Sequence, residues 1–227
     1  MQRTPQFITG DFEPHHCFLS EYGRALDALV KAVSDVLVTS GDCTRVFLGK
    51  RKVEPQPDWW YIGGRVRPGE TPQQGAAKNV RRELKLDLPV ERFEVIANYS
   101  FVWRMRAQEP VENGTGDIST VHHLRLSDDE VAAVVLDDKE YSDARWIPVD
   151  DVLAGEFHPA LKQAIRDLRA KQAYQRLAEA VGHGGDDGEV AACARELLRC
   201  GAEAPTVPLQ INFDEESRAY AVKPKEK

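Results

Sequence analysis

The residues best suited to chemistry lie between Gly63 and Glu83. A glycine pair, Gly63 and Gly64, is followed after five residues by Glu70 and then by a segment that carries Glu83. Glycines allow the backbone to approach a ligand such as pyrophosphate closely, because no side chain intervenes. Asn79 and Glu83 stand four residues apart, so on a helix both side chains point to the same side. Carboxylate oxygens suit Mg²⁺, which usually takes one or two of them with water and phosphate oxygens. The pattern indicates a site where a metal ion and a phosphorylated molecule meet.

A helix must position these side chains, and the sequence carries a clear signal for its start. Thr71 is a suitable N-cap, Pro72 suits the first helical position, and Gln74 completes a capping box. We expect this helix to run to about Leu86. Its apolar stripe consists of Ala76, Ala77, Val80 and Leu84. The stripe would hold one face of the helix against a core and so fix where its polar side chains point.

The rest of the chain mixes helical and strand patterns. Apolar residues recur at helical spacing over 20–33, which predicts an N-terminal helix. Strands are predicted at 36–39, 45–48, 59–62, 93–103, 119–126 and 143–147. Further helices are expected at 159–181 and 189–199, separated by a glycine-rich linker at 182–188, with a candidate hairpin in 209–222. This mixture predicts an α/β protein with a C-terminal extension.

Composition narrows the class of protein. The chain has 227 residues and a formal net charge of −7, so no overall field attracts it to nucleic acid or to an anionic membrane. Its longest apolar run is too short to span a membrane, and its four scattered cysteines form no C-x-x-C pair of the kind that binds zinc. We therefore expect a cytoplasmic protein with no nucleic acid or membrane partner, and a possible homodimer.

The stretch from Gly64 onward resembles the Nudix box, G-x5-E-x7-R-E-U-x-E-E-x-G-U, in which U is an aliphatic residue. The matching positions are Gly64, Glu70, Val80, Glu83 and Leu86. The replaced positions are Lys78 for the arginine, Asn79 and Arg82 for two glutamates, and Lys85 for the second glycine. The resemblance implies a Nudix-type α/β/α sandwich with a mixed β-sheet. It divides the chain into an N-terminal segment and helix (1–32), a Nudix domain (33–181), and a linker with a C-terminal helical extension (182–227).

Within the family, the sequence is most similar to the GDP-mannose mannosyl hydrolase branch, whose box also keeps only the last glutamate. The similarity extends to the segments 48–51, 63–66, 86–89 and 140–146. It implies a Mg²⁺ ion, or Mn²⁺, held by the Gly63 carbonyl, Glu83 and Glu140. It also implies that Arg51 and Arg65 stabilise the departing diphosphate through guanidinium contacts.

The general base of that branch is a histidine, and Tyr141 stands at the corresponding position of this sequence. With a reference pKa of about 10, a tyrosine is a poor base near neutral pH. Asp143, His122 or His123 are the alternatives that the sequence offers, although the two histidines alternate on a predicted strand.

Several conspicuous residues have ordinary structural explanations. Glu70 is expected to pair with Lys78 and to support the loop before the helix. Trp59 and Trp60 alternate sides on a strand, so at most one packs into the core from a given face. His15 and His16, in the irregular N-terminus, are not expected to belong to a site.

Two functions compete on this evidence. The first is a metal-dependent Nudix hydrolase acting on a nucleoside diphosphate linked to another group, with a nucleotide-sugar such as GDP-mannose as the best guess. The second is a catalytically impaired Nudix-fold module that binds a nucleotide without turnover. A usual Nudix helix offers three glutamates where Asn79, Arg82 and Glu83 together carry no net charge, so we expect weak metal binding.

Overall fold

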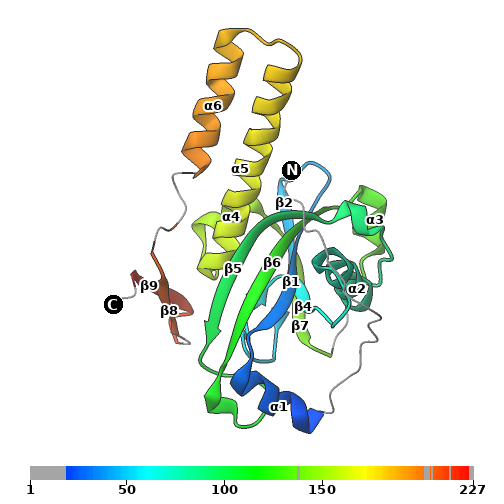
Figure 1. Cartoon of the computed structure of the whole chain (residues 1–227), viewed down its shortest axis with the longest axis vertical. Helices are drawn as coiled ribbons and strands as arrows, with labels where there is room; N and C mark the ends of the chain where they lie inside the picture. Colours follow the sequence, from blue (N-terminus) through cyan, green and yellow to red (C-terminus); the bar gives the residue numbers. More distant parts are fainter. Residues whose placement is uncertain (1–18, 137–138, 202–204, 206, 215, 225–227) are drawn as a thin grey trace. The chain divides into compact units, whose positions relative to one another are not determined.

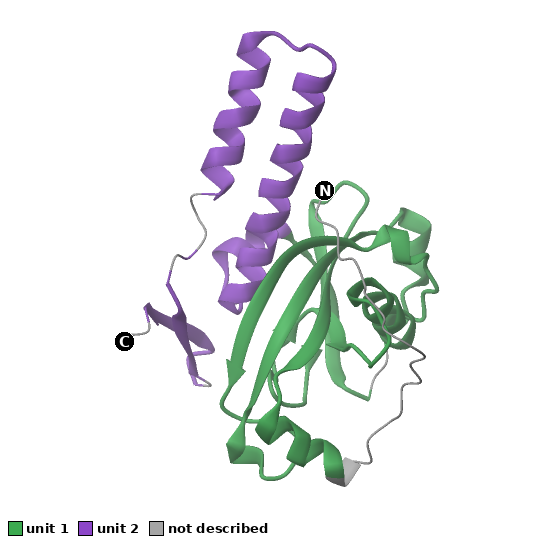
Figure 2. Cartoon of the chain, viewed as in Figure 1, with its two compact units in different colours: residues 1–148 green, residues 149–227 purple. Residues whose placement is uncertain are grey.

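The computed structural model describes residues 19–136, 139–201, 205, 207–214 and 216–224. The chain forms two compact units, Met1–Pro148 and Val149–Lys227, which are coloured separately in Figure 2. His15 and His16 lie outside the described residues.

A mixed β-sheet dominates the first unit and, among the described residues, contains seven strands (Figure 1). The strands are β1 (Lys31–Thr39), β2 (Arg45–Arg51), β3 (Trp59–Trp60), β4 (Ile62–Arg65), β5 (Glu94–Trp103), β6 (Thr115–Arg125) and β7 (Tyr141–Pro148). β1 runs parallel to β6 and antiparallel to both β2 and β4. β3 and β7 pair with β2, and β5 pairs with β6, all of them antiparallel. β1 is therefore a central strand with neighbours on both sides.

Three α-helices accompany this sheet in the described part of the first unit: α1 (Leu19–Ala28), α2 (Pro72–Leu84) and α3 (Asp128–Ala133). α2 begins with the predicted capping box, since Thr71 Oγ1 accepts from Gln74 N at 3.2 Å and Gln74 Oε1 accepts from Thr71 N at 2.8 Å. Its Ala76, Val80 and Leu84 are fully buried in one core cluster with side chains of β1, β2, β4 and β6. Burial of this kind contributes about 1.5–3 kcal/mol for each large aliphatic side chain. It fixes α2 against the sheet and so sets the direction of its polar residues.

Two sequence expectations about element bounds are wrong. The first helix ends at Ala28, and β1 begins at Lys31, so the helix does not continue to Val33. Pairing with β4 and β6 outweighs the local helical spacing there. The predicted strand at 59–62 is split into β3 and β4, and the glycine pair lies within β4 rather than ending a strand. Gly63 and Gly64 continue the ladder because Asp35 and Ser34 of β1 pair with them.

The end of α2 shows how the chain tolerates one departure from the family pattern. Lys85 is the C-cap and has a left-handed backbone with φ of 58°. This conformation costs a residue with a Cβ roughly 1–2 kcal/mol, which explains why a glycine is usual there. The chain keeps the turn with a lysine, whose Nζ donates to the Arg82 carbonyl at 2.6 Å.

The second unit holds the two C-terminal helices and the hairpin that the sequence predicts, preceded by a short helix, α4, that it does not predict. They are α4 (Val149–Ala154), α5 (Pro159–Gly182), α6 (Asp187–Gly201), β8 (Leu209–Asp214) and β9 (Ala219–Pro224). α5 and α6 lie side by side, joined by a short turn in the glycine-rich segment (Figure 1). No helix in the described ranges is both long enough and apolar enough to cross a membrane. The expected α/β fold with a mixed sheet and a C-terminal helical part is confirmed.

His158 begins α5 and is buried, with 4% of its surface exposed. Its Nδ1 accepts from Ala160 N at 3.1 Å, so the imidazole serves as the N-cap. The ring also lies edge-on to Tyr220 of β9, with 5.4 Å between the centroids. Burial lowers the pKa of His158 to about 3, which keeps the ring neutral in the folded chain.

Candidate functional site

The glycine pair of β4 lies where the backbone is approached closely from two sides. A Cβ at Gly63 would collide with the Asp35 carboxylate and would lie 2.9 Å from the Ser34 carbonyl oxygen. A Cβ at Gly64 would come within 3.1 Å of Arg82 Nη2. Glycine is therefore needed at 63 for steric reasons, and both positions leave backbone atoms accessible to polar groups.

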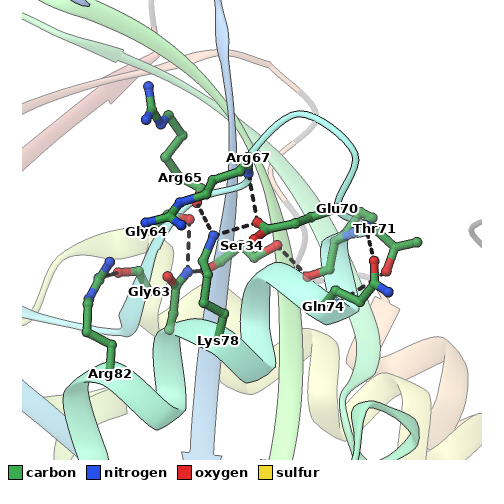
Figure 3. Close-up of polar contacts among 12 residues, drawn as sticks. Ser34, Gly63, Gly64, Arg65, Arg67, Glu70, Thr71, Gln74, Lys78 and Arg82 are labelled. Atoms are coloured by element: carbon green, nitrogen blue, oxygen red, sulfur yellow. Dashed lines mark hydrogen bonds and ion pairs between the residues drawn. The ribbon is translucent and has the colours of Figure 1, made fainter. Parts of the chain in front are cut away.

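Arg82 of α2 connects two of the predicted metal ligands. Its Nη2 donates to the Gly63 carbonyl oxygen at 3.3 Å, as Figure 3 shows, and forms an ion pair with the Glu83 carboxylate. The Glu83 side chain is 2% exposed, whereas that of Arg82 is 47% exposed. One side of the Arg82 guanidinium thus covers the buried Glu83 carboxylate, and the other side faces solvent.

The charges of this pair depend on each other. Burial raises the pKa of the Glu83 carboxyl, although the Arg82 guanidinium and the Tyr141 hydroxyl counter part of that effect. Burial alone would lower the pKa of Arg82, but the Glu83 carboxylate raises it above its ordinary value. The guanidinium therefore stays cationic next to the Gly63 carbonyl.

Tyr141 of β7 holds the other side of Glu83. Its hydroxyl donates to Glu83 Oε2, and its ring is buried. Burial, together with the Glu83 charge, raises the pKa of Tyr141 well above its ordinary value. A phenol that is already a donor and resists ionisation cannot accept a proton near neutral pH. In this arrangement Tyr141 orients the carboxylate.

Glu140 approaches the same cluster from the residue before β7. It is partly buried, and its charge acts to raise the pKa values of Glu83 and Tyr141. The three predicted metal ligands, Gly63, Glu83 and Glu140, are therefore brought together. They converge, however, on the guanidinium of Arg82, whose pKa the Glu140 charge also raises.

The donors at this point do not fit a divalent cation as they stand. Both oxygens of Glu83 and the Gly63 carbonyl already contact protein donors. Asn79 is fully buried and, within the described residues, its Oδ1 has no hydrogen-bond partner, which leaves one neutral acceptor. In the described part of the chain, no three His, Cys, Asp or Glu side chains form a group that could hold a metal. The charge of Arg82 would oppose a cation 5 Å away by roughly 3 kcal/mol per unit charge at an effective dielectric of about 20.

Asp35 is a site residue that sequence reasoning missed. Its carboxylate lies against Gly63, is 4% exposed, and accepts from Ser119 Oγ at 2.6 Å. Burial raises its pKa to about 7, the Ser119 hydrogen bond and Arg51 lower it, and the charge of Glu83 adds to the rise. In the sequence Asp35 is the one carboxylate in the mostly apolar segment 32–38, and this placement is unusual only because the segment is a buried strand.

The two predicted phosphate-binding arginines differ in position. Arg51 is half-buried, and its charge lowers the pKa values of Asp35 and Tyr141, so it belongs to the cluster around Gly63. Arg65 is exposed, and its guanidinium lies over the Tyr22 ring, 4.4 Å from the centroid. In Figure 3 the Arg65 side chain extends away from Arg82 and Gly63. The structure therefore gathers Arg51 but not Arg65 around the glycine pair.

The alternative general bases have other partners. His123 Nε2 is hydrogen bonded to Thr39 Oγ1 at 2.9 Å, and His122 is fully buried next to it in β6. Asp143 Oδ2 forms an ion pair with Arg145 at 2.7 Å. The hydrogen bond to Thr39 explains the burial of the His123 ring in structural terms.

The two tryptophans behave as the strand alternation predicts. Trp60 is buried and packs against Phe101 and Trp103, with ring centroids 5.7 and 5.6 Å away. Trp59 is partly exposed and lies beside the cations Lys50 and Arg145.

The expected pairing of Glu70 with Lys78 is present and leads to a stability prediction. Glu70 Oε2 accepts from Lys78 Nζ at 2.5 Å and from Arg67 N at 2.8 Å (Figure 3). Glu70→Gln is expected to lower the free energy of unfolding by about 1 kcal/mol, because the loop loses a charge-assisted contact at a partly exposed site. Urea unfolding would measure the change. The exposed Glu91→Gln is the control, and an equal loss in both variants would contradict the assignment.

Comparison with known proteins places this geometry in a family. A comparison with curated proteins finds no match. Among solved structures, the MutT protein from Methanosarcina mazei Go1 is 18% identical with a TM-score of 0.48, the match covering 63% of this chain and 95% of that one. The NUDIX domain of Shewanella oneidensis NrtR, complexed with ADP ribose, is 17% identical with a TM-score of 0.49 and coverages of 67% and 97%. The NUDIX domain family model matches residues 30–168, which is more than half of the chain. The chain therefore belongs to the Nudix family.

Proposed function

We propose that this chain is a Nudix-fold module that binds a nucleoside diphosphate linked to a second group, with a nucleotide-sugar such as GDP-mannose as the leading candidate. The observation that carries the proposal is the ion pair of Arg82 with Glu83, which also occupies the Gly63 carbonyl. It places a permanent positive charge beside an accessible glycine backbone, and Arg51 adds a second one nearby. Guanidinium groups recognise phosphate oxygens in a bidentate manner, which suits a diphosphate.

The same ion pair favours binding over turnover. The carboxylate that the family uses as a metal ligand is neutralised, and the residue at the branch's base position is a hydrogen-bond donor to that carboxylate. Without a free metal ligand and a base, the positioned residues bind and orient a diphosphate but do not activate water.

Hydrolysis is the second candidate, and Asp35 is the observation that favours it. This carboxyl lies against the glycine pair, and its only described hydrogen-bond donor from a side chain is Ser119. A carboxyl in this place is within reach of a water molecule bound beside the Gly63 backbone, which is what a general base requires.

A cytoplasmic location, a homodimer and the division at residues 32 and 181 remain predictions from the sequence.

A panel of nucleotides separates these two functions. Nucleotide-sugars, dinucleotides and nucleoside triphosphates would be added with EDTA, Mg²⁺ or Mn²⁺, and both binding and product release would be measured. We expect a nucleotide-sugar to stabilise the protein against heat without product release. A ligand at one hundred times its Kd adds about 2.7 kcal/mol to the free energy of unfolding, which is readily detected.

Arg51→Gln tests whether the ligand is bound at this cluster. The variant is expected to bind about ten- to a hundredfold more weakly, because a charge-assisted hydrogen bond contributes about 1.5–3 kcal/mol. Arg45→Gln, on the exposed start of the same strand, is the control and should bind as the parent does. Product release by the parent would replace the binding function with hydrolysis, and absence of any nucleotide binding would overturn both.

A further inference from the structure

A cleft on the exposed side of α2 carries mainly positive charge. It has a volume of about 550 Å³ and is lined by Arg67, Glu70, Lys78, Arg81 and Arg82. Four cations and one carboxylate give the lining a formal charge of +3, in a chain whose net charge is −7. A basic cleft in an acidic protein is a local feature that attracts an anion against the overall field.

Contacts within the cleft leave much of this charge available. Glu70 is already held by Lys78 and by the backbone of Arg67, so it does not neutralise the arginines (Figure 3). The Arg67 side chain is exposed. Within the described ranges, the ion-pair partner of Arg81 is the exposed Asp87 at 3.9 Å, a distance at which the pair contributes little. Arg67 and Arg81 can therefore exchange solvent for phosphate oxygens without breaking a buried contact.

Arg82 joins this cleft to the glycine pair. One guanidinium nitrogen contacts the Gly63 carbonyl and the Glu83 carboxylate, while the side chain as a whole is about half exposed and lines the cleft. A guanidinium has five N–H donors, and in the part of the chain that the structure describes both contacts of Arg82 are made through Nη2, which leaves the other donors for a ligand. The guanidinium thus stands where a cation would lie between the Gly63 carbonyl, the Glu83 carboxylate and a phosphate.

We propose that the cleft binds a chain of two or more phosphates without a divalent cation, with Arg82 in the place that a metal ion would take. The inference rests on the proposed function, because the phosphates of a nucleotide bound at the glycine pair would extend into this cleft. The ligand class is an oligophosphate, either free or as part of a nucleotide.

Titration of the unaltered full-length protein gives the first test. Binding of GDP, of inorganic tripolyphosphate and of Mg²⁺ alone would be measured by calorimetry, the two phosphates both in EDTA and in excess Mg²⁺. We expect both phosphates to bind in EDTA at least as tightly as in Mg²⁺, and Mg²⁺ alone not to bind at millimolar concentrations. Tighter binding of GDP than of tripolyphosphate supports a nucleotide source, whereas the reverse order supports a free oligophosphate. Binding that requires Mg²⁺ would overturn the inference and leave the proposed function intact.

Variants give the second test. Arg82→Gln and Arg81→Gln are each expected to weaken tripolyphosphate binding in EDTA about ten- to a hundredfold, which corresponds to the loss of one charge-assisted contact. Arg125→Gln, an exposed change on β6 outside the cleft, is the matched control and should not alter binding. Circular dichroism would confirm that each variant is folded. Unchanged affinity in both cleft variants would overturn the inference, and if Arg82→Gln fails to fold, Arg81→Gln and the titrations of the parent still decide it.

Discussion

Changing Asn79 and Arg82 together to glutamate is expected to tighten Mg²⁺ binding by at least about a hundredfold. The double change restores the family's carboxylates next to Glu83 and removes the guanidinium that occupies Gly63. The local charge falls by three units, and each unit acts on a cation about 5 Å away with roughly 3 kcal/mol before solvent screening. Isothermal titration with Mg²⁺ would measure the gain.

The same variant should be unusually dependent on the metal for stability. Asn79 Nδ2 now donates to the carbonyl oxygens of Gly64 and Ser34 at 3.0 and 3.3 Å, and a glutamate there would face those oxygens without a donor. We expect the double variant to unfold at a lower temperature than the parent in EDTA and to regain stability with Mg²⁺. At a Mg²⁺ concentration one hundred times its Kd, metal binding adds about 2.7 kcal/mol to the free energy of unfolding.

Arg81→Glu is the control for charge alone. It changes the charge of the neighbouring α2 residue by two units but removes no contact with Gly63 or Glu83. Unchanged Mg²⁺ affinity in the double variant would mean that the α2 face with Glu83 does not border the metal position. Hydrolysis by the double variant and none by the parent would identify Asn79 and Arg82 together as the feature that separates binding from turnover.

The sequence predicts α2 well because the signals for it are local. A capping box needs only residues within one turn, and the buried stripe of Ala76, Val80 and Leu84 repeats at helical spacing. The sequence predicts too long a first helix for the opposite reason. Whether Val33 continues a helix or starts β1 depends on β4 and β6, which are distant in the sequence.

The site itself could be predicted only in part. The Nudix pattern locates Gly63, Glu83 and Arg82, but it does not say that the arginine turns back to hold both of the others. That contact depends on the register that places Gly63 opposite Asp35 in β1. Asp35 escaped notice because its meaning comes from tertiary neighbours rather than from spacing. A buried carboxylate is recognisable as unusual only after the strand around it is known to be central.

Acid is expected to weaken the start of α5 strongly, through His158. The folded pKa of about 3 lies below the ordinary value of 6.5, so the unfolded chain takes up a proton in this range and the folded chain does not. The stability that the neutral ring contributes is therefore complete above pH 6.5 and is lost as the pH falls towards 3. The full difference corresponds to about 5 kcal/mol, and about 2 kcal/mol of it is lost between pH 6.5 and 5.

His158→Asn isolates this effect, because asparagine keeps an N-cap acceptor for Ala160 N but does not titrate. The variant loses the ring contact with Tyr220 and is expected to be less stable at pH 7. The informative quantity is therefore the change between pH 7 and pH 5, which should be about 2 kcal/mol smaller in the variant than in the parent. Amide hydrogen exchange of α5 would measure it locally. His183→Asn, at the exposed C-cap of the same helix, should keep the parent's pH dependence. If His158→Asn and the parent lose the same protection on acidification, the imidazole is not held neutral by burial, and the acid sensitivity of this helix has another origin.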